Sequence, residues 1–211
     1  MKKLFVTGIG TDIGKTIVSA ILTEALAADY WKPVQAGSID YTDSMAVQAL
    51  ISNPYSKIHP EAYLLQTPAS PHYAAELENR DIDLQSIKLP VTTNKCIIIE
   101  GAGGLMVPLN KDELIIDLIK QLEAEVVIVV KNYLGSINHT LMTVAVLQQK
   151  NIPIAGIIFN DETVAHAETY ILQYSGLKCL AKVMHEPQIT KEIVQQYALA
   201  IDKVVLLNDE I

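Results

Sequence analysis

The sequence predicts a doubly wound α/β fold, in which a mostly parallel β-sheet carries helices on both faces. Short runs rich in Ile and Val alternate with longer amphipathic segments along the whole chain. The runs are nearly continuous in hydrophobicity, as in strands buried on both faces of a parallel sheet. Alternation of strands and helices is typical of βαβ units. The length of 211 residues, half of them hydrophobic, suffices for a substantial core, so we expect one domain over residues 1–211.

The expected elements follow one another in order along the chain. The apolar runs predict strands at residues 4–7, 96–99, 126–130, 154–159 and, more weakly, 179–183. The amphipathic segments between them predict helices at residues 15–28, 44–51, 115–122, 138–149, 164–174 and 190–199. Residues 54–90 have no clear periodicity, and we expect them to run over the surface as one long excursion. Long loops in compact domains often carry function.

Composition excludes several classes of protein. The net charge of −8 leaves no overall basic field for binding nucleic acid. No stretch approaches the roughly 20 apolar residues that cross a bilayer, and no signal peptide is visible, so a cytoplasmic protein is expected. Cys96 and Cys179 each lie in an apolar run, which predicts buried free thiols rather than a metal or redox site.

The most specific signal is a glycine-rich turn at residues 7–16, with the sequence TGIGTDIGKT. It follows an apolar strand and opens an amphipathic helix, which is the context of a phosphate-binding loop of the P-loop NTPase type. Its backbone N–H groups and the helix N-terminus favour an anion. Lys15 can reach the β- and γ-phosphates of a nucleotide, and the Thr16 hydroxyl can ligate Mg²⁺. Gly8 and Gly14 enclose five residues, where the usual pattern encloses four.

Charged residues follow two other apolar segments. Glu100 comes directly after the strand at 96–99 and precedes the glycine-rich residues 101–104. Ligands of open α/β sheets bind at the carboxyl ends of the strands, so Glu100 can hold Mg²⁺ together with Thr16. Lys32 stands in the short apolar segment at 30–34, where a lysine needs an anionic partner unless it lies on the surface. Asp43 precedes the next helix, where it is either a functional carboxylate or a plain helix N-cap.

Two further strand ends carry polar groups. Gly135 and Ser136 precede the helix at 138–149, and free N–H groups at such a turn bind carboxylates, although ordinary capping by Ser136 explains them equally well. Asn160 and Asp161 end the strand at 154–159. The Asn160 amide could read the edge of a nucleobase or form a local turn.

Taken together, these residues resemble the dethiobiotin synthetase family. The resemblance depends on five blocks in family order: residues 7–16, the block KPVQAG at 32–37, Ser-Pro-His at 70–72, EGAGG at 100–104 and LGSINH at 134–139. The glycine-rich turn is shared by many ATPases, whereas the block at 32–37 together with that at 100–104 is far more specific. The blocks lie within residues 1 to 165.

The resemblance implies an ATP-dependent cyclo-ligase that forms dethiobiotin, ADP and phosphate from 7,8-diaminononanoate, CO₂ and ATP. Lys15 and Lys32 would flank the transferring phosphoryl group. The implied metal ligands for Mg²⁺ are Thr16, Asp43 and Glu100. The implied nucleotide-binding residues are Asp12, Ile13, Gly14, Lys15, Thr16, Ile17, Asp43, Glu100, Gly101, Ala102, Gly103, Asn160 and Asp161. The implied substrate-binding residues are Lys32, Ala36, Gly103, Gly135, Ser136, Ile137 and Asn138.

The resemblance also implies a homodimer with the substrate bound across the interface. Residues 135–138 of one chain would then meet the diamine bound by the other. Ala36 departs from the family, whose members often carry Ser or Thr there, and Ser38 lies two residues away. The segment 183–187 departs from the turn that helps to hold adenine, so the sequence predicts no preference among nucleobases.

Two other functions compete with this interpretation. Other amide-forming synthetases of the same superfamily normally carry a glutaminase domain, for which 211 residues leave no room. MinD/ParA-like switch ATPases carry a second lysine near residues 8–10, where this chain has Gly-Ile-Gly. They also often carry a basic amphipathic tail, whereas residues 207–211 here read LNDEI.

Overall fold

A seven-stranded parallel sheet forms the centre of the molecule. The structure is a computed structural model that describes residues 1–207; residues 208–211, part of the tail considered above, lie outside the described range. All neighbouring strands pair in parallel. Their spatial order is β4 (Ile58–His59), β2 (Asp29–Trp31), β6 (Cys96–Glu100), β1 (Lys2–Gly8), β7 (Glu125–Lys131), β8 (Ile154–Asn160) and β9 (Cys179–Val183).

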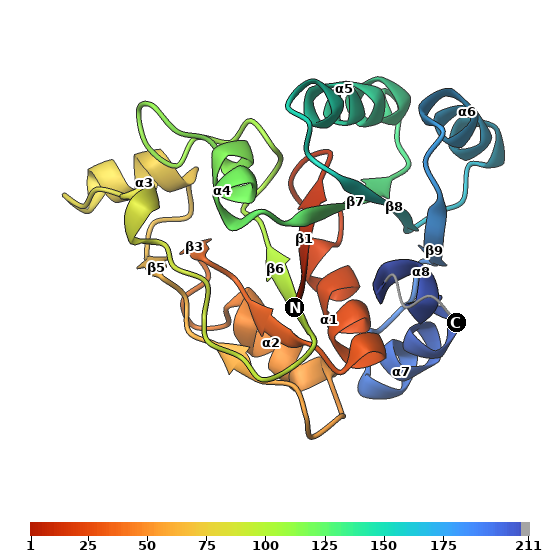
Figure 1. Cartoon of the computed structure of the whole chain (residues 1–211), viewed down its shortest axis with the longest axis horizontal. Coiled ribbons are helices and arrows are strands. Elements are labelled where there is room, and N and C mark those ends of the chain that lie inside the picture. The colour runs from red at the N-terminus through yellow and green to blue at the C-terminus, as the bar shows by residue number, and fades with distance from the viewer. Residues whose placement is uncertain (208–211) are drawn as a thin grey trace.

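Helices cover both faces of this sheet (Figure 1). Alternate residues of β1 point to opposite faces, so Leu4 and Val6 belong to one apolar cluster and Phe5 to the other. The Leu4 cluster packs under α1 (Lys15–Leu26), α2 (Asp43–Leu50), α7 (Lys191–Ala200) and α8 (Lys203–Leu207). The Phe5 cluster packs under α4 (Ile115–Leu122), α5 (Ser136–Gln149) and α6 (Ala165–Ser175). The predicted doubly wound α/β fold is confirmed.

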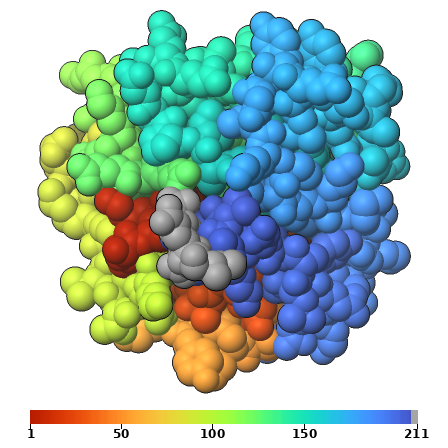
Figure 2. Space-filling view, turned by 45° about the vertical axis from the view of Figure 1, so that its right-hand side comes forward, coloured from red at the N-terminus to blue at the C-terminus, as the bar shows by residue number. Residues whose placement is uncertain are grey.

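Helix α7, near the end of the described range, packs against α1, the first helix of the chain. Figure 2 shows the blue C-terminal segment packed directly against earlier parts of the chain. Val194 and Ala198 of α7 lie in the same buried cluster as Val18 and Ile21 of α1. The last helices therefore help to fix α1, the helix that begins at the glycine-rich turn.

The predicted surface excursion at residues 54–90 is wrong in part. This segment contains β4, β5 (Tyr63–Leu65), α3 (Pro71–Leu77) and a 3₁₀ turn at Leu84–Ser86, and β5 pairs with β3 (Val34–Ala36) in a second, two-stranded sheet. Leu65, Ile82 and Ile87 are buried in the Phe5 cluster. Elements of two to seven residues are too short to display a regular hydrophobic period, which is why the pattern did not reveal them.

The expectation for the cysteines is confirmed for one of them and wrong for the other. Cys96 is buried in β6, and burial raises the pKa of its thiol to about 12. Cys179 is exposed, because it begins the edge strand β9, which has a neighbour on one side only. Within residues 1–207, none of the helices has the length and apolar character needed to cross a membrane.

Candidate active site

The sheet topology brings three separate chain segments to one edge. β2, β6 and β1 are neighbours, and their carboxyl ends lead into Lys32, Glu100 and the glycine-rich turn. Trp31 pairs with Ile99, so Lys32 and Glu100 come next on adjacent parallel strands. The sequence predicted that these groups lie at a ligand-binding edge, and the strand order places them side by side.

The glycine-rich turn leads from β1 into α1. Gly14 precedes the helix with φ of +87°, and a side chain there would collide with the Asn160 amide, since a Cβ would come within 2.2 Å of its nitrogen. Asp12 also has a positive φ, of 55°. Both residues therefore hold backbone conformations that curl the turn over the helix N-terminus.

Lys15 lies folded back on this turn. Its Nζ donates a hydrogen bond to the Gly10 carbonyl at 2.9 Å, and the residue is buried. Burial lowers its pKa below the ordinary lysine value and outweighs the opposing effect of the Glu100 carboxylate. An anion bound at this turn would stabilise the charged form of Lys15. The Lys15 ammonium group would in turn stabilise the anion, and this attraction is stronger in a buried site of low dielectric constant than in water.

A compact charged cluster lies beside the turn. Lys32 Nζ bridges two carboxylates, at 2.5 Å from Asp43 Oδ2 and 3.1 Å from Glu100 Oε1. Both Lys32 and Glu100 are almost fully buried. Burial alone would lower the pKa of Lys32, but the carboxylates of Glu100 and Asp43 outweigh it and raise that pKa above the ordinary lysine value. Lys32 therefore stays protonated at every physiological pH, and the surface-lysine alternative is wrong.

Thr16 adds a third oxygen to this cluster. Its Oγ1 lies 3.0 Å from Asp43 Oδ1 and 3.0 Å from Glu100 Oε1. A hydroxyl has one hydrogen and can satisfy one of these acceptors at a time. Adjacent oxygens around an octahedral Mg²⁺, with bonds of about 2.0–2.1 Å, lie about 3 Å apart. The spacing and the hard oxygen donors of Thr16, Asp43 and Glu100 therefore fit Mg²⁺, which also keeps waters and phosphate oxygens as ligands.

Thr42 and Gln35 position Asp43. The N-cap of α2 is Thr42, whose side chain accepts from Met45 N, so the alternative of Asp43 as a plain N-cap is wrong. The buried Gln35 accepts from Asp43 N at 3.3 Å and donates to Gly37 O at 3.0 Å. Asp43 is thus free to turn its carboxylate toward Thr16 and Lys32.

These groups line a cavity of about 750 Å³ that is large enough for a nucleotide tail and a small substrate. Most predicted site residues line it: Asp12, Ile13, Gly14, Lys15, Thr16, Ile17, Lys32, Ala36, Asp43, Glu100, Ala102 and Gly103. Ser38 and Ser70 also line it, so the cavity that contains Ala36 has two serine residues in its lining. Gly101 does not; it packs against Phe5, whose ring would lie 2.7 Å from an added Cβ.

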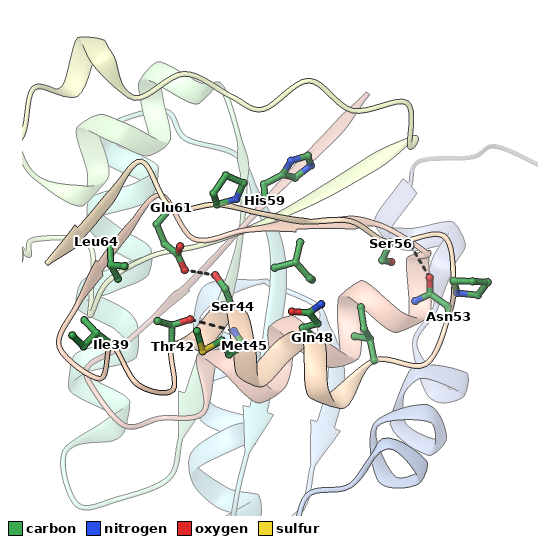
Figure 3. Close-up of a pocket in the computed structure, with 14 residues that line it drawn as sticks. Ile39, Thr42, Ser44, Met45, Gln48, Asn53, Ser56, His59, Glu61 and Leu64 are labelled. Carbon is green, nitrogen blue, oxygen red and sulfur yellow. Dashed lines mark hydrogen bonds between the residues drawn. The ribbon is translucent and has the colours of Figure 1, made fainter. Parts of the chain in front are cut away.

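A second cavity lies between α2 and β4 (Figure 3). It measures about 520 Å³, and Ser44 and Glu61 meet in it at 2.5 Å. None of the described residues that line it is Lys or Arg. It therefore lacks the cations that a triphosphate needs, whereas Lys15 and Lys32 line the cavity beside the glycine-rich turn.

Asn160 and Asp161 lie at the end of β8, outside that cavity. Asn160 Nδ2 donates to Ile13 O at 2.9 Å, which ties β8 to the glycine-rich turn. The Asp161 carboxylate pairs with Lys131 at 2.6 Å and with His185 at 3.0 Å. Contact of either residue with a nucleobase stays a prediction.

The turn before α5 is not part of the cavity within this chain. Gly135 precedes the helix with φ of +108°, and Ser136 makes no capping hydrogen bond, so ordinary capping by Ser136 is wrong. Ser136 is buried, whereas Asn138 is exposed and Leu134 is completely exposed. A role of residues 135–138 in substrate binding stays a prediction.

Sequence reasoning missed two residues that the structure places behind this site. Gln35 holds Asp43, as described above. The Tyr30 hydroxyl donates to Glu100 Oε2 at 2.9 Å from a fully buried position. Tyr30 lies two residues before Lys32 on the same side of the strand, and this spacing was the signal that could have revealed it.

Comparison with known proteins decides the family. The chain is 52% identical to the ATP-dependent dethiobiotin synthetase BioD of Cytophaga hutchinsonii over 95% of this chain and 97% of that protein. It is 46% identical to that of Christiangramia forsetii, over 93% and 94% of the two chains. The chain belongs to the dethiobiotin synthetase family. The prediction of an ATP-dependent ligase of this family is confirmed.

The fold of this family member has wider relatives. A family model described as "AAA domain" matches residues 2–193. A plasmid partition protein of Borrelia burgdorferi bound to AMPPNP superimposes with a TM-score of 0.61 at 13% identity, covering 99% of both chains. The cell division ATPase MinD of Pyrococcus furiosus gives a TM-score of 0.58 at 14% identity, covering 95% of this chain and 98% of that chain. Likeness at this identity shows the P-loop ATPase fold alone, so the switch-ATPase alternative gains nothing from it.

Proposed function

We propose that this family member joins CO₂ to 7,8-diaminononanoate at the cost of ATP and forms dethiobiotin, ADP and phosphate, a step of biotin biosynthesis. One amine of the diamine adds to CO₂ and gives a carbamate with loss of a proton. A carbamate oxygen attacks the γ-phosphorus of ATP, and ADP leaves. The second amine then attacks the carbonyl carbon, and phosphate leaves as the ureido ring closes.

The observation that carries this proposal is the buried Lys32 beside the phosphate-binding turn. The phosphoryl transfer brings two anions together, because both the carbamate and the triphosphate are negatively charged. Fixed cations that meet both reactants lower the barrier most effectively in a water-poor site. Lys15 and Lys32 both line the cavity. Lys15 is folded back on the glycine-rich turn and Lys32 lies among the carboxylates beside it, which suits them to hold the triphosphate and the carbamate respectively.

Thr16, Asp43 and Glu100 would hold Mg²⁺ in this proposal, as their spacing allows. The ion supplies charge neutralisation for the triphosphate. Asp43 and Glu100 each contact Lys32 in the structure, so the same carboxylates orient the ammonium group. Ala36, Ser38 and Gly103 line the cavity where the carbamate would lie.

We also propose a homodimer in which the turn before α5 completes the partner's substrate site. Exposed apolar residues on a free surface favour association, and Leu134 is completely exposed beside Gly135 and Asn138. Free N–H groups at this helix N-terminus favour the substrate's carboxylate. Residues 1–211 would form one domain in each protomer, acting in the cytoplasm.

ATP consumption by the purified protein tests the function directly. ADP release should require both 7,8-diaminononanoate and bicarbonate, and one equivalent of dethiobiotin should appear for each ADP. A switch ATPase would ignore the diamine. Equal ADP release with and without the diamine would therefore overturn the proposal.

A further inference from the structure

The side chains of Tyr30 and Glu100 meet on adjacent strands. Tyr30 of β2 pairs with Ile98 of β6, and Glu100 lies two residues farther along β6 on the same face of the sheet. The phenol hydroxyl donates to Glu100 Oε2 at 2.9 Å. Tyr30 is completely buried and Glu100 is 1% exposed, so water cannot replace this hydrogen bond.

The two oxygens of the Glu100 carboxylate have separate partners. Oε1 faces the cavity, where it accepts from Thr16 Oγ1 and Lys32 Nζ. Oε2 faces the interior, where Tyr30 is its donor in the described part of the chain. A buried carboxylate oxygen without a donor is costly, so removing the phenol hydroxyl would favour rotation of the carboxylate away from its present orientation.

We propose that Tyr30 is a positioning residue that fixes the Glu100 carboxylate with Oε1 toward the phosphate-binding turn, and thereby sets the strength of Mg²⁺ binding beside the nucleotide. The inference rests on the proposed role of Glu100 as a magnesium ligand. A phenol hydroxyl can donate a hydrogen bond to a carboxylate, which is acceptor-only, and this donor lies 2.9 Å from Glu100 Oε2.

The alternative is that Tyr30 is only a core residue. Its ring packs in the same apolar cluster as Leu4 and Ile98, and a phenylalanine ring would fill that space equally well. The hydroxyl is the one part of the side chain that packing does not need. A variant that removes only this oxygen therefore separates the two roles.

The test compares Tyr30→Phe with the unaltered protein by calorimetric titration of ADP, in the presence of Mg²⁺ and in EDTA. The measured quantity is the factor by which Mg²⁺ tightens ADP binding. We expect this factor to fall about tenfold, the loss of one hydrogen bond to a charged group. Binding of ADP in EDTA should be unchanged. The factor is a ratio of affinities of the same folded protein, so partial unfolding of a variant does not alter it.

Activity gives a second readout. In Tyr30→Phe, turnover should fall about tenfold for the same reason, while the KM for the diamine stays unchanged. The matched control is Tyr55→Phe, which removes a hydroxyl from a tyrosine that is 70% exposed. This control should change neither turnover nor the factor by which Mg²⁺ tightens ADP binding, which we call the magnesium factor.

A double variant tests whether Tyr30 affects Mg²⁺ binding through Glu100. If Tyr30 acts through Glu100, Tyr30→Phe should lower the magnesium factor no further in a protein that already carries Glu100→Gln. An additional loss in the double variant would overturn the inference. An unchanged factor in Tyr30→Phe, beside a lost factor in Glu100→Gln, would also overturn it. An unchanged factor in Glu100→Gln itself would instead remove Glu100 from the metal site.

Discussion

Lys32 Nζ lies 3.1 Å from Glu100 Oε1, although 68 positions separate the two residues in the chain. The parallel pairing of β2 with β6 brings them to the same edge. Both side chains are nearly inaccessible to water, so the Glu100 carboxylate depends on Lys32 for compensation of its charge, and Lys32 depends on Glu100 and Asp43. The pairing therefore places an ammonium group beside the glycine-rich turn without leaving a buried charge uncompensated.

Removal of the Lys32 ammonium should lower turnover by at least about 100-fold, because a cation that meets the developing charge in phosphoryl transfer is lost. The change is Lys32→Ala, and the measurement is ADP release with diamine and bicarbonate present. Lys57→Ala is the matched control, since Lys57 is an exposed lysine beside Asp29, at the amino end of β2 and away from the cavity. Near-normal turnover in Lys32→Ala would remove that residue from the mechanism.

Binding of ATP should be accompanied by proton uptake at alkaline pH. Burial lowers the pKa of Lys15 in the free protein, and a triphosphate beside it raises that pKa again. Affinity for ATP should therefore fall as the pH rises through the lowered pKa, below the ordinary lysine value of 10.5. Calorimetry in buffers of different ionisation enthalpy measures the proton uptake directly. Lys15→Arg should show none, and uptake that persisted in this variant would assign the proton to another group.

Asn138→Ala should weaken binding of the diamine by about tenfold, the loss of a hydrogen bond to a charged group, and leave ATP affinity unchanged. Asn138 is exposed at the start of α5, outside the cavity of its own chain, so the effect depends on a second protomer. Gln148→Ala, at the exposed far end of the same helix, is the control. Sedimentation measures the assembly in parallel. An unchanged dissociation constant for the diamine would count against a site shared between protomers.

Asp29→Ala should destabilise the fold by roughly 2–4 kcal/mol without changing turnover, because several hydrogen bonds to a buried carboxylate are lost. Asp29 lies at the amino end of β2, away from the cavity, and accepts from Lys57 N, His59 Nε2 and Asn94 Nδ2. Urea unfolding at neutral pH measures the change. A large loss of turnover at unchanged stability would show that this end of the sheet communicates with the active site.

The loss of stability in Asp29→Ala should itself depend on pH, and the direction of that dependence follows from the pKa of Asp29. Burial opposes ionisation of Asp29, but its hydrogen bonds outweigh burial and lower its pKa. The stabilisation is therefore present above the unfolded value of about 3.9 and is lost as the pH falls through the lower folded value. The difference in unfolding free energy between the protein and Asp29→Ala should shrink over that acid range, and a constant difference would contradict the assignment.

The sequence predicted five of the seven strands of the main sheet, because each of those strands has at least five residues; β2 and β4, with three and two residues, were too short to be predicted. The residues predicted at 126–130 and 154–159 lie inside β7 and β8, which extend by one residue or none at either end. Helix α1 ends two residues before its predicted end at 28, because Ala27 adopts a left-handed conformation with φ of +46°. No local pattern marks such a residue in advance.

The site was predicted from short motifs wherever a residue stands next to a strand end, as Lys15, Lys32 and Glu100 do. Tyr30 and Gln35 escaped prediction because their roles depend on partners that only the tertiary fold supplies. The turn at 135–138 lies outside the cavity, and its proposed role in a partner's site depends on an assembly that a single chain does not display.

A crystal structure with a non-hydrolysable ATP analogue, Mg²⁺ and 7,8-diaminononanoate would show directly how the cavity holds its ligands. We expect a triphosphate within the turn at 8–16, a metal ion held by Thr16, Asp43 and Glu100, and the Lys32 ammonium group directed toward the γ-phosphate. A nucleotide bound elsewhere, or Lys32 turned away from the bound triphosphate, would contradict this expectation.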